Sequence, residues 1–560
     1  MEQAEGHAWP AWQELARAAG LGGLAAELQA AAEELEAALA QVREVLAYPL
    51  PGETEPALVF QPGWEQAWGA LAPAEQGRAG PAAGGPVQGP GAAPALPGDA
   101  APPGAPACFL SVSEAAVLVA RGDLSPVELV TSCLERIEQV EPAVGAWVQV
   151  LRDEALEQAR RAEQAVRQGQ QGLGPLHGIP FGAKDIFHAA GVPTRAGTRG
   201  WQVLPDEDAE AVRRLRQAGA ILLGKTTTTE FAFRDPPATR NPWKLAHTPG
   251  GSSSGSAAAV AARMVPLALG SQTGGSLSRP AAYCGVVTLK PTYGLVSRRG
   301  VLPLAWSLDH VGAFTRTVED QALVLAVLAG ADPHDPATWL AGRAWGARPA
   351  AGAAGPRAPG RAGVVGVPDR FFGEQAEPAC WQLFQQALRV LEQAGYRVES
   401  VKLPSSFEAA QAAHALIMRV EAAAYHLDRL RSRPEMLRGG IRRLAATGAV
   451  LPAVAYERAQ QLRRLYAREM AELFRHVTLL ATPATPGPAP VGLEWTGPFT
   501  FNAPFSMAGL PTLTLPMGRV EPGLPVGLQL AARPFGEEEL LEAGMAFQAA
   551  TSWHRECPAL

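Results

Sequence analysis

Two serines and one lysine have the setting that nucleophilic catalysis needs. Ser252 stands in the run TPGGSSSGS and Ser276 in the run QTGGSLSRP, each among glycines and other small residues. Lys184 lies upstream in HGIPFGAKDIF, where large apolar neighbours would exclude water and lower its pKa toward neutrality. A serine hydroxyl is a poor nucleophile at its ordinary pKa, so it needs a base and a route for its proton. These residues supply both without a histidine.

The chemistry that we expect from them is a proton relay. Neutral Lys184 would take a proton from Ser252, Ser252 would take one from Ser276, and Ser276 would attack an amide carbonyl carbon. The relay would then return a proton to the leaving nitrogen, and water would hydrolyse the acyl-enzyme. Asp185 opposes this scheme if its carboxylate points inward, because a nearby negative charge favours the ammonium form. A solvated Lys-Asp pair is the alternative interpretation of this dipeptide.

The run TGGS at 273–276 has the composition of a turn that binds an oxyanion. Its glycines can adopt positive φ and let a substrate carbonyl approach, so that successive N–H groups converge on one oxygen. Each such donor stabilises a transition state by roughly 2.7–4 kcal/mol. Glycine and serine runs are also typical of linkers, but these alternate with a predicted small-residue helix at 257–262 and buried apolar runs at 265–269 and 286–289. We therefore place the serines on turns between packed elements.

These stretches resemble the amidase signature family. The likeness rests on TPGGSSSGS, QTGGS and TLKPTYG, and it extends from about Leu110 to the C-terminus through HGIPFGAKD, GAILLGKTTTTEFAF and GLPVGLQLAARPF. It implies an α/β fold in which a central mixed β-sheet is flanked by helices on both faces. It also implies an amidohydrolase that acts on linear amides.

The resemblance assigns a role to each of these residues. Ser276 corresponds to the nucleophile, Ser252 to a bridging serine held through a cis peptide, and Lys184 to the base. The backbone N–H groups that would form the oxyanion hole belong to Thr273, Gly274, Gly275 and Ser276.

The chain departs from the family pattern D-T-G-G-S-I-R-x-P beside the nucleophile. Gln272 occupies the acidic position and Ser278 the basic one, and Arg279 follows one step later. Losing both charges together is consistent, since removing one alone would leave a buried charge unpaired at a cost of about 3–5 kcal/mol. We interpret this version as a subgroup marker that leaves the triad intact and the substrate open.

Two formal motif matches point to other chemistry. The segment 219–226, GAILLGKT, fits the phosphate-binding pattern G-x-x-x-x-G-K-[ST], but its interval AILL is itself strand-like, and we predict a buried strand there. The run GSSSG fits G-x-S-x-G and would make Ser253 a nucleophile, with Asp309, His310 and His554 available as partners. The preceding HTPGG is typical of a turn rather than the strand that this motif requires. We favour neither alternative.

The composition excludes several other classes of protein. The 560 residues are 47% hydrophobic with a net charge of −6, which indicates a large core and no basic surplus for nucleic acid. No histidine pair has metal-ligand spacing and the five cysteines form no C-x-x-C, so we expect no metal, no cofactor and no disulfide framework. No apolar run approaches the ~18–20 residues of a membrane span and the N-terminus lacks the features of a signal peptide. We expect a cytoplasmic enzyme.

We divide the chain into three parts. Residues 1–65 form a helical module, in which leucines and valines recur at helical spacing from Leu24 to Leu46. Residues 66–108 are rich in Gly, Ala and Pro and have the composition of a linker. Residues 109–560 form the catalytic domain, which begins with the predicted capping boxes SVSE and SPVE. A second low-complexity run covers 341–362.

The N-terminal module, over roughly residues 10–62, resembles the small helical subunit that accompanies some amidases, including that of the cyanuric-acid degradation pathway. It is more remotely similar to the small subunit of tRNA-dependent amidotransferases. Such a module would pack on the catalytic domain in cis or in trans. An unrelated extension or a dimerisation arm, which would make a homodimer, is the alternative.

The hypothesis that follows is an amidase that cleaves a small linear amide and releases ammonia or an amine. The N-terminal module favours a carbamoyl or biuret-type amide. The likeness to amidotransferases allows a different function, hydrolysis of glutamine with ammonia passed to a partner. A non-catalytic scaffold is a third hypothesis, against which the intact Lys184, Ser252 and Ser276 argue.

Overall fold

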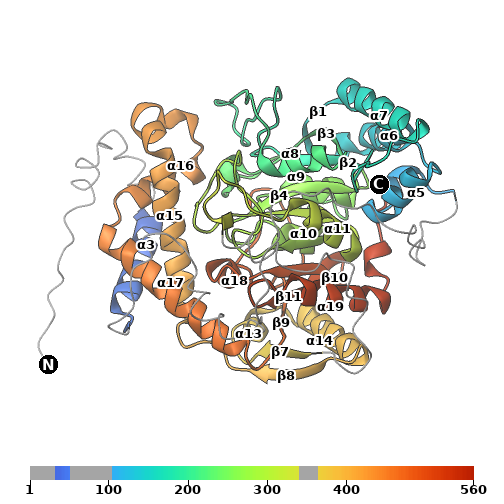
Figure 1. Ribbon diagram of the computed structural model, residues 1–560. Helices are drawn as coiled ribbons and strands as arrows, with labels where there is room; N and C mark the ends of the chain where they lie inside the picture. Colours follow the sequence, from blue (N-terminus) through green and yellow to red (C-terminus); the bar gives the residue numbers. More distant parts are fainter. Residues whose placement is uncertain (1–31, 51–103, 340–362) are drawn as a thin grey trace, which may run out of the picture.

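One large mixed sheet forms the centre of the protein in a computed structural model that describes residues 32–50, 104–339 and 363–560 (Figure 1). Most of the expected linker at 66–108 and all of the run at 341–362 lie outside these residues. The described strands pair in the order β1-β3-β2-β4-β6-β5-β10-β11-β9-β7-β8. They are β1 Trp147–Val150, β2 Pro180–Lys184, β3 Ile221–Thr226, β4 Leu267–Gln272, β5 Val287–Lys290, β6 His310–Thr315, β7 Val364–Pro368, β8 Arg397–Val401, β9 Leu479–Pro483, β10 Thr512–Val520 and β11 Leu524–Ala532.

Helices cover both faces of this sheet, as the family likeness implies (Figure 1). Helices α9 and α10 pack on each other and on neighbouring strands, and α8, α11, α14 and α19 form a second set of mutual contacts. The α-helices are α3 Ala32–Ala47, α5 Val112–Arg121, α6 Pro126–Val144, α7 Arg152–Arg167, α8 Glu210–Gln217, α9 Ser254–Ala261, α10 Ser278–Cys284, α11 Val318–Leu328, α13 Phe372–Gln375, α14 Pro378–Gln393, α15 Phe407–Ser432, α16 Gly439–Ala449, α17 Ala453–Leu473, α18 Ala503–Met507 and α19 Glu537–Ala549. None of the described helices is long and apolar enough to cross a membrane.

Strand β2 lies between β3 and β4 and pairs with both in parallel. The carboxyl ends of parallel strands meet at one edge of a sheet, so the residues at the ends of β2 and β4 are brought together there. The segment at 219–226 enters β3, whose six residues are all buried. This confirms the buried strand that we predicted in place of a phosphate-binding loop.

The small residues of helix α9 pack closely against the strands and the segments next to them. An added Cβ at Gly255 would lie 2.2 Å from the carbonyl oxygen of Ala146 and 2.4 Å from the backbone nitrogen of Thr227. The Ser256 hydroxyl donates a hydrogen bond of 2.8 Å to the carbonyl oxygen of Leu269 in β4. Because the small residues allow this close approach, the turn that leads into α9 is fixed to the sheet, and Ser252 lies on that turn.

Helix α3 packs on α15, α16 and α17 in the same chain (Figure 1). Its buried apolar side chains are Leu35, Ala38, Val42 and Val45, whereas Leu46, which the leucine spacing included in the apolar stripe, is 36% exposed. Polar contacts also hold α3 on these helices. They are Arg419 Nη1 to Gln41 Oε1 at 2.6 Å, Arg443 Nε to Glu34 Oε1 at 3.1 Å, and Arg458 Nη2 to the Tyr48 carbonyl at 2.9 Å. The kinship of this helix to an accessory subunit stays a prediction.

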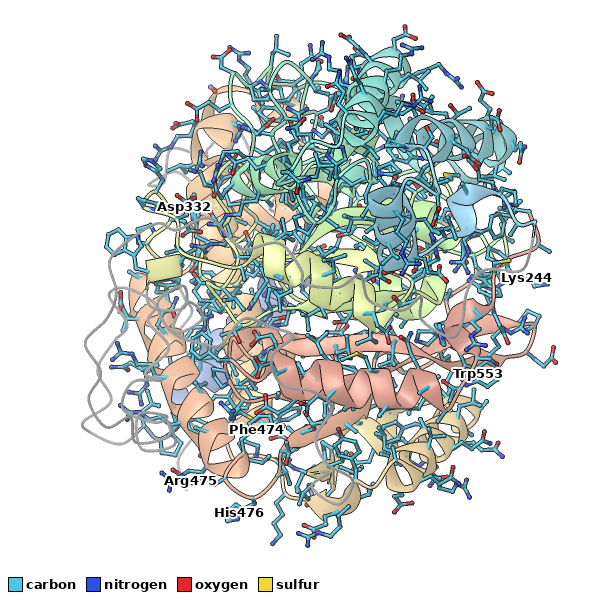
Figure 2. The ribbon with its side chains drawn as sticks, turned by 45° about the vertical axis from the view of Figure 1, so that its right-hand side comes forward. Lys244, Asp332, Phe474, Arg475, His476 and Trp553 are labelled. Carbon is cyan, nitrogen blue, oxygen red and sulfur yellow. The ribbon has the colours of Figure 1, made fainter. Side chains whose placement is uncertain are left out.

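The helical layer formed by α15, α16 and α17 returns to the sheet at one edge of the molecule. Phe474, Arg475 and His476, which follow α17, lie at that edge (Figure 2). The chain then enters β9. At the other end of the catalytic part, Ser111 forms the predicted capping box with Glu114. Ser125 caps α6 by accepting two backbone N–H groups, but the reciprocal bond that we expected from Glu128 is not part of this cap.

A substitution of Gly255 by alanine tests the close contact of α9 with the strands. The added methyl would meet backbone atoms at 2.2 and 2.4 Å, so helix or strand must move. We expect the free energy of unfolding to fall by about 1–3 kcal/mol, the usual cost of overpacking. Chemical denaturation monitored by circular dichroism measures this change.

Gly200 provides the control, because the nearest atom to an added Cβ there is the Cα of Met436 at 3.8 Å. Gly200→Ala should unfold within about 0.5 kcal/mol of the wild type, as surface substitutions usually do. Equal stability of the two variants would show that α9 does not depend on this contact.

Candidate active site

Lys184, the last residue of β2, has a fully buried amine with two hydroxyl partners. Its Nζ donates to Ser252 Oγ at 2.7 Å and to Ser271 Oγ at 2.8 Å. Burial lowers the pKa of Lys184 to about 7, while the negative charge of Asp309 raises it and the positive charge of Arg279 lowers it. An amine with this pKa is half uncharged near neutral pH, which suits a general base.

The neighbouring Asp185 does not neutralise this amine. Its carboxylate forms a fully buried ion pair with Lys225 Nζ of β3 at 2.9 Å and accepts the backbone N–H of Arg195 at 3.1 Å. Lys225 Nζ also donates to Thr194 Oγ1 at 3.0 Å. The inward carboxylate that would have opposed the relay is therefore engaged elsewhere, and the solvated Lys-Asp pair is excluded.

Ser252 follows a cis peptide bond, as the family likeness implied. The buried guanidinium of Arg279 holds the Gly251 carbonyl of that bond, through Nε at 3.1 Å and through Nη2, and its Nη1 reaches the Gly497 carbonyl. Burial lowers the pKa of Arg279 to about 10. Arg279, which stands one position later than the arginine of the family pattern, thus holds the backbone next to Ser252.

The run at 273–276 lines a cavity of about 280 Å³. Neither Gly274 nor Gly275 has positive φ, so our expectation of that backbone conformation was wrong. Close packing is what requires glycine here. An added Cβ would lie 2.8 Å from the ring of Phe499 at Gly274 and 2.6 Å from Asn502 Oδ1 at Gly275.

Ser276 lies on the wall of this cavity and is 8% exposed. Within the described ranges no hydrogen bond joins its Oγ to Ser252 Oγ. Of the two contacts in the expected relay, the structure therefore contains the one between Lys184 and Ser252 and lacks the one between Ser252 and Ser276. Catalytic hydrogen bonds are often loose before substrate binds and tighten in the reacting complex.

Gln272 stands where the family pattern has an aspartate. Its neutral amide both accepts and donates hydrogen bonds. Its Oε1 accepts the backbone N–H groups of Leu277 and Ser278 at 2.8 and 2.9 Å, at the start of α10. Its Nε2 donates to Ser506 Oγ at 3.1 Å, and that hydroxyl donates to the Gly274 carbonyl at 3.1 Å. The amide therefore orders the turn at 273–278 without bringing in a charge.

Thr273 is held from two sides. Its hydroxyl donates to Asp309 Oδ1 at 2.5 Å, and His414 Nε2 donates to its carbonyl at 3.1 Å. The other oxygen of Asp309 accepts the N–H groups of Leu304 and Ala305 at 2.9 and 3.1 Å. Burial raises the pKa of Asp309 to about 6, which leaves this carboxylate ionised at neutral pH.

Sequence reasoning missed two of these residues. Ser271 precedes the QTGGS run and lies in β4, which pairs directly with the strand of Lys184, so strand pairing was the signal that could have found it. Asp309 was considered only as an acid for Ser253, but it bonds Thr273 instead. Ser253 Oγ donates to the Ser271 carbonyl at 3.3 Å, and no strand precedes it. The G-x-S-x-G interpretation is therefore not supported.

The nearby thiol and the acidic and histidine side chains offer no second centre in the described part of the chain. Cys284 is buried, its thiol donates to the Pro249 carbonyl at 3.4 Å, and burial raises its pKa far above the ordinary value, which is unfavourable for a nucleophile. Over the same described residues, no group of three or more His, Cys, Asp or Glu side chains is placed to hold a metal ion.

Comparison with known proteins fits this geometry. Residues 128–541 match the model of the Amidase family. The chain is 38% identical over 500 residues to a glutamyl-tRNA(Gln) amidotransferase subunit of Chloroflexus aggregans, and the match covers 81% of this chain and 98% of that protein. It is 38% identical over 467 residues to an amidase of Pseudomonas putida, and that match covers 80% of this chain and 98% of that protein.

A solved structure of an unexpected vestigial protein complex, which reveals the evolutionary origins of an s-triazine catabolic enzyme, is also similar. It is 33% identical with a TM-score of 0.73, and the match covers 79% of this chain and 98% of that chain. The extent of these matches, together with a buried lysine bonded to a serine beside a cavity, shows that the chain belongs to the amidase family and is an amidohydrolase.

Proposed function

We propose that this enzyme hydrolyses the C–N bond of a small linear amide through an acyl-enzyme on Ser276. The observation that carries the proposal is the buried Lys184 amine, 2.7 Å from Ser252 Oγ, in a fold that also places Ser276 on the wall of a cavity. A cavity of about 280 Å³ suits a small molecule rather than a folded protein chain.

The reaction begins with two proton transfers. Neutral Lys184 takes the Ser252 proton, Ser252 takes the Ser276 proton, and Ser276 Oγ bonds to the carbonyl carbon. The carbonyl oxygen becomes an oxyanion, which the N–H groups of the run at 273–276 stabilise. The relay then delivers a proton to the leaving nitrogen as the C–N bond breaks. Water attacks the resulting ester, its proton returns to Ser276, and a carboxylate leaves.

A carbamoyl or biuret-type amide is our first choice of substrate. The likeness of the N-terminal module to accessory subunits supports it, and so does the 33% identity to a chain of the vestigial complex that reveals the origins of an s-triazine catabolic enzyme. A helix packed on α15, α16 and α17 is compatible with a fused module of that kind.

Glutamine hydrolysis within an amidotransferase is the second candidate. The 38% identity to a glutamyl-tRNA(Gln) amidotransferase subunit, over 98% of that protein, favours it. This function predicts little free turnover without a partner that accepts ammonia. An ammonia-release screen of the isolated enzyme over biuret, aliphatic, aryl and amino-acid amides, with glutamine included, separates the two candidates.

Substitutions of the proposed nucleophile and base test the mechanism. Ser276→Ala should abolish ammonia release and labelling by a fluorophosphonate, because no other hydroxyl can form the covalent bond. Lys184→Met should lower both rates by at least about 100-fold, the low end of what a general base contributes. Ammonia assays and mass spectrometry of the labelled peptide measure these effects.

Ser253→Ala is the matched control, since the Ser253 hydroxyl belongs to the rejected G-x-S-x-G motif. This variant should still be labelled by the fluorophosphonate. Circular dichroism of each variant establishes that the protein is folded. Full activity in the Ser276 or Lys184 variant would refute the assignment. A folded wild type that is never labelled would favour the scaffold hypothesis.

The pH dependence should report the Lys184 amine. Burial lowers its pKa to about 7, and only the uncharged form accepts a proton. We expect kcat/KM for a substrate that does not titrate to fall about tenfold per pH unit below pH 7 and to level off above it. A stopped-time assay between pH 5 and 9 measures the profile. An acid limb centred near pH 10, the range of a solvated lysine, would contradict a desolvated base.

A further inference from the structure

The cavity that contains Ser276 has a wall with positive charge and no carboxylate. Its charged lining residues are Arg234 and Arg279, and the others are apolar, aromatic, glycine, proline or hydroxyl residues. A substrate in this cavity therefore meets cations and neutral groups. The two arginines differ in how their guanidinium groups are used.

Arg279 is committed to the protein backbone. It is buried and donates to the carbonyls of Gly251 and Gly497. Arg234 is exposed, and its Cζ lies 5.4 Å from the ring centroid of Phe233. In the part of the chain that the structure describes, Arg234 has no ion pair and no hydrogen bond to its guanidinium. All of its donors therefore remain available at the wall of the catalytic cavity.

The acidic side chains of the neighbouring segments are turned to other partners. Asp235, the next residue, accepts the backbone N–H groups of Gly440 and Ile441 at 3.2 and 3.1 Å. Glu494 Oε2 accepts the N–H of Leu493 at 3.0 Å. Both carboxylates thus accept backbone N–H groups, and within the described residues neither forms an ion pair with Arg234.

The charge of Arg234 also acts on other guanidinium groups. Burial lowers the pKa of Arg279 to about 10, and repulsion from Arg234 acts in the same direction. Burial lowers the pKa of Arg419 as well, again with repulsion from Arg234. Arg419 follows Met418, which lines the same cavity. Arg234 and Arg279 both line the cavity, so an anion bound there would offset the repulsion between their charges.

We propose that Arg234 selects amides whose acyl part carries a carboxylate in addition to the scissile amide, which within the carbamoyl class favours carboxylated members over neutral biuret. The planar guanidinium matches a carboxylate with two parallel hydrogen bonds. A primary amide releases ammonia, which carries no substituent. The carboxylate must therefore belong to the acyl part of the substrate. This inference rests on the proposed function and names the substrate class of that site. Since the contact is the same in the ground state and the transition state, it acts mainly on KM.

Matched pairs of small amides test the selection. Succinamate is compared with butanamide, and glutaramate with pentanamide, so that a methyl group replaces the carboxylate. Each is assayed at pH 8 for ammonia release and for protection of Ser276 from fluorophosphonate labelling, in the wild type, Arg234→Gln and Arg240→Gln. Arg240 is the control, because it is exposed on the same loop but does not line the cavity.

The wild type should favour the anionic member of each pair at least about tenfold in kcat/KM or in protection. Arg234→Gln should lose that preference through a higher KM for the anionic amides, while its kcat/KM for the neutral amides stays within twofold of the wild type. Arg240→Gln should keep the preference for the anionic amides. Preference of the wild type for the neutral amides, or an unchanged ratio in Arg234→Gln, overturns the inference but leaves the amidase mechanism standing. Absence of both labelling and turnover in the folded wild type would overturn the proposed function itself, and this inference with it.

Discussion

The geometry proposed for catalysis depends on a lysine amine that is shielded from water and has no counterion. Water or an adjacent carboxylate would return Lys184 to its ordinary pKa and leave it without a lone pair for Ser252. The charges around it are therefore satisfied by other groups. Asp185 is paired with Lys225, and Asp309 is held by a threonine hydroxyl and two backbone N–H groups. Each buried carboxylate has partners that offset part of the cost of its burial, although burial still raises the pKa of Asp185 and of Asp309.

The sheet makes this arrangement by placing short, apolar strands side by side in parallel. Strands β2 and β4 end at the same edge, so Lys184 and Ser271 meet although they are 87 positions apart. Strand β3 lies on the other side of β2 and contributes Lys225, which diverts Asp185. Two turns complete the site, and the small residues of α9 and the glycines at 274 and 275 let both turns approach neighbouring chain segments closely.

The sequence predicts the residues whose role is local and misses those whose role depends on distant partners. The setting of Lys184 in apolar sequence predicts its burial, and the family likeness supplies the cis peptide before Ser252. The contact of Arg279 with Gly497 spans 218 positions, and nothing near either residue indicates it. The same holds for Asp309, which pairs 36 positions away from Thr273.

The glycines show a subtler failure of sequence reasoning. A glycine pair in a catalytic turn suggests a left-handed backbone, which is a local property of the chain. In the structure the need for glycine comes from Phe499 and Asn502, which approach from a segment far along the sequence. Similarly, leucine spacing assigned Leu46 to the buried stripe of the N-terminal helix, whereas the helices of the catalytic part bury Val45. In both cases the packing partner decides.

Helix α15 joins features that the sequence separates. One of its residues, His414, donates to the Thr273 carbonyl in the turn at 273–276, and Met418 lines the cavity that contains Ser276. The next residue, Arg419, reaches back to Gln41 in α3 at 2.6 Å. The same helix therefore contacts α3 at one position and the turn at 273–276 at another, and it lines the cavity between them. A displacement of α15 would therefore alter its contact with α3 and its contact with this turn together.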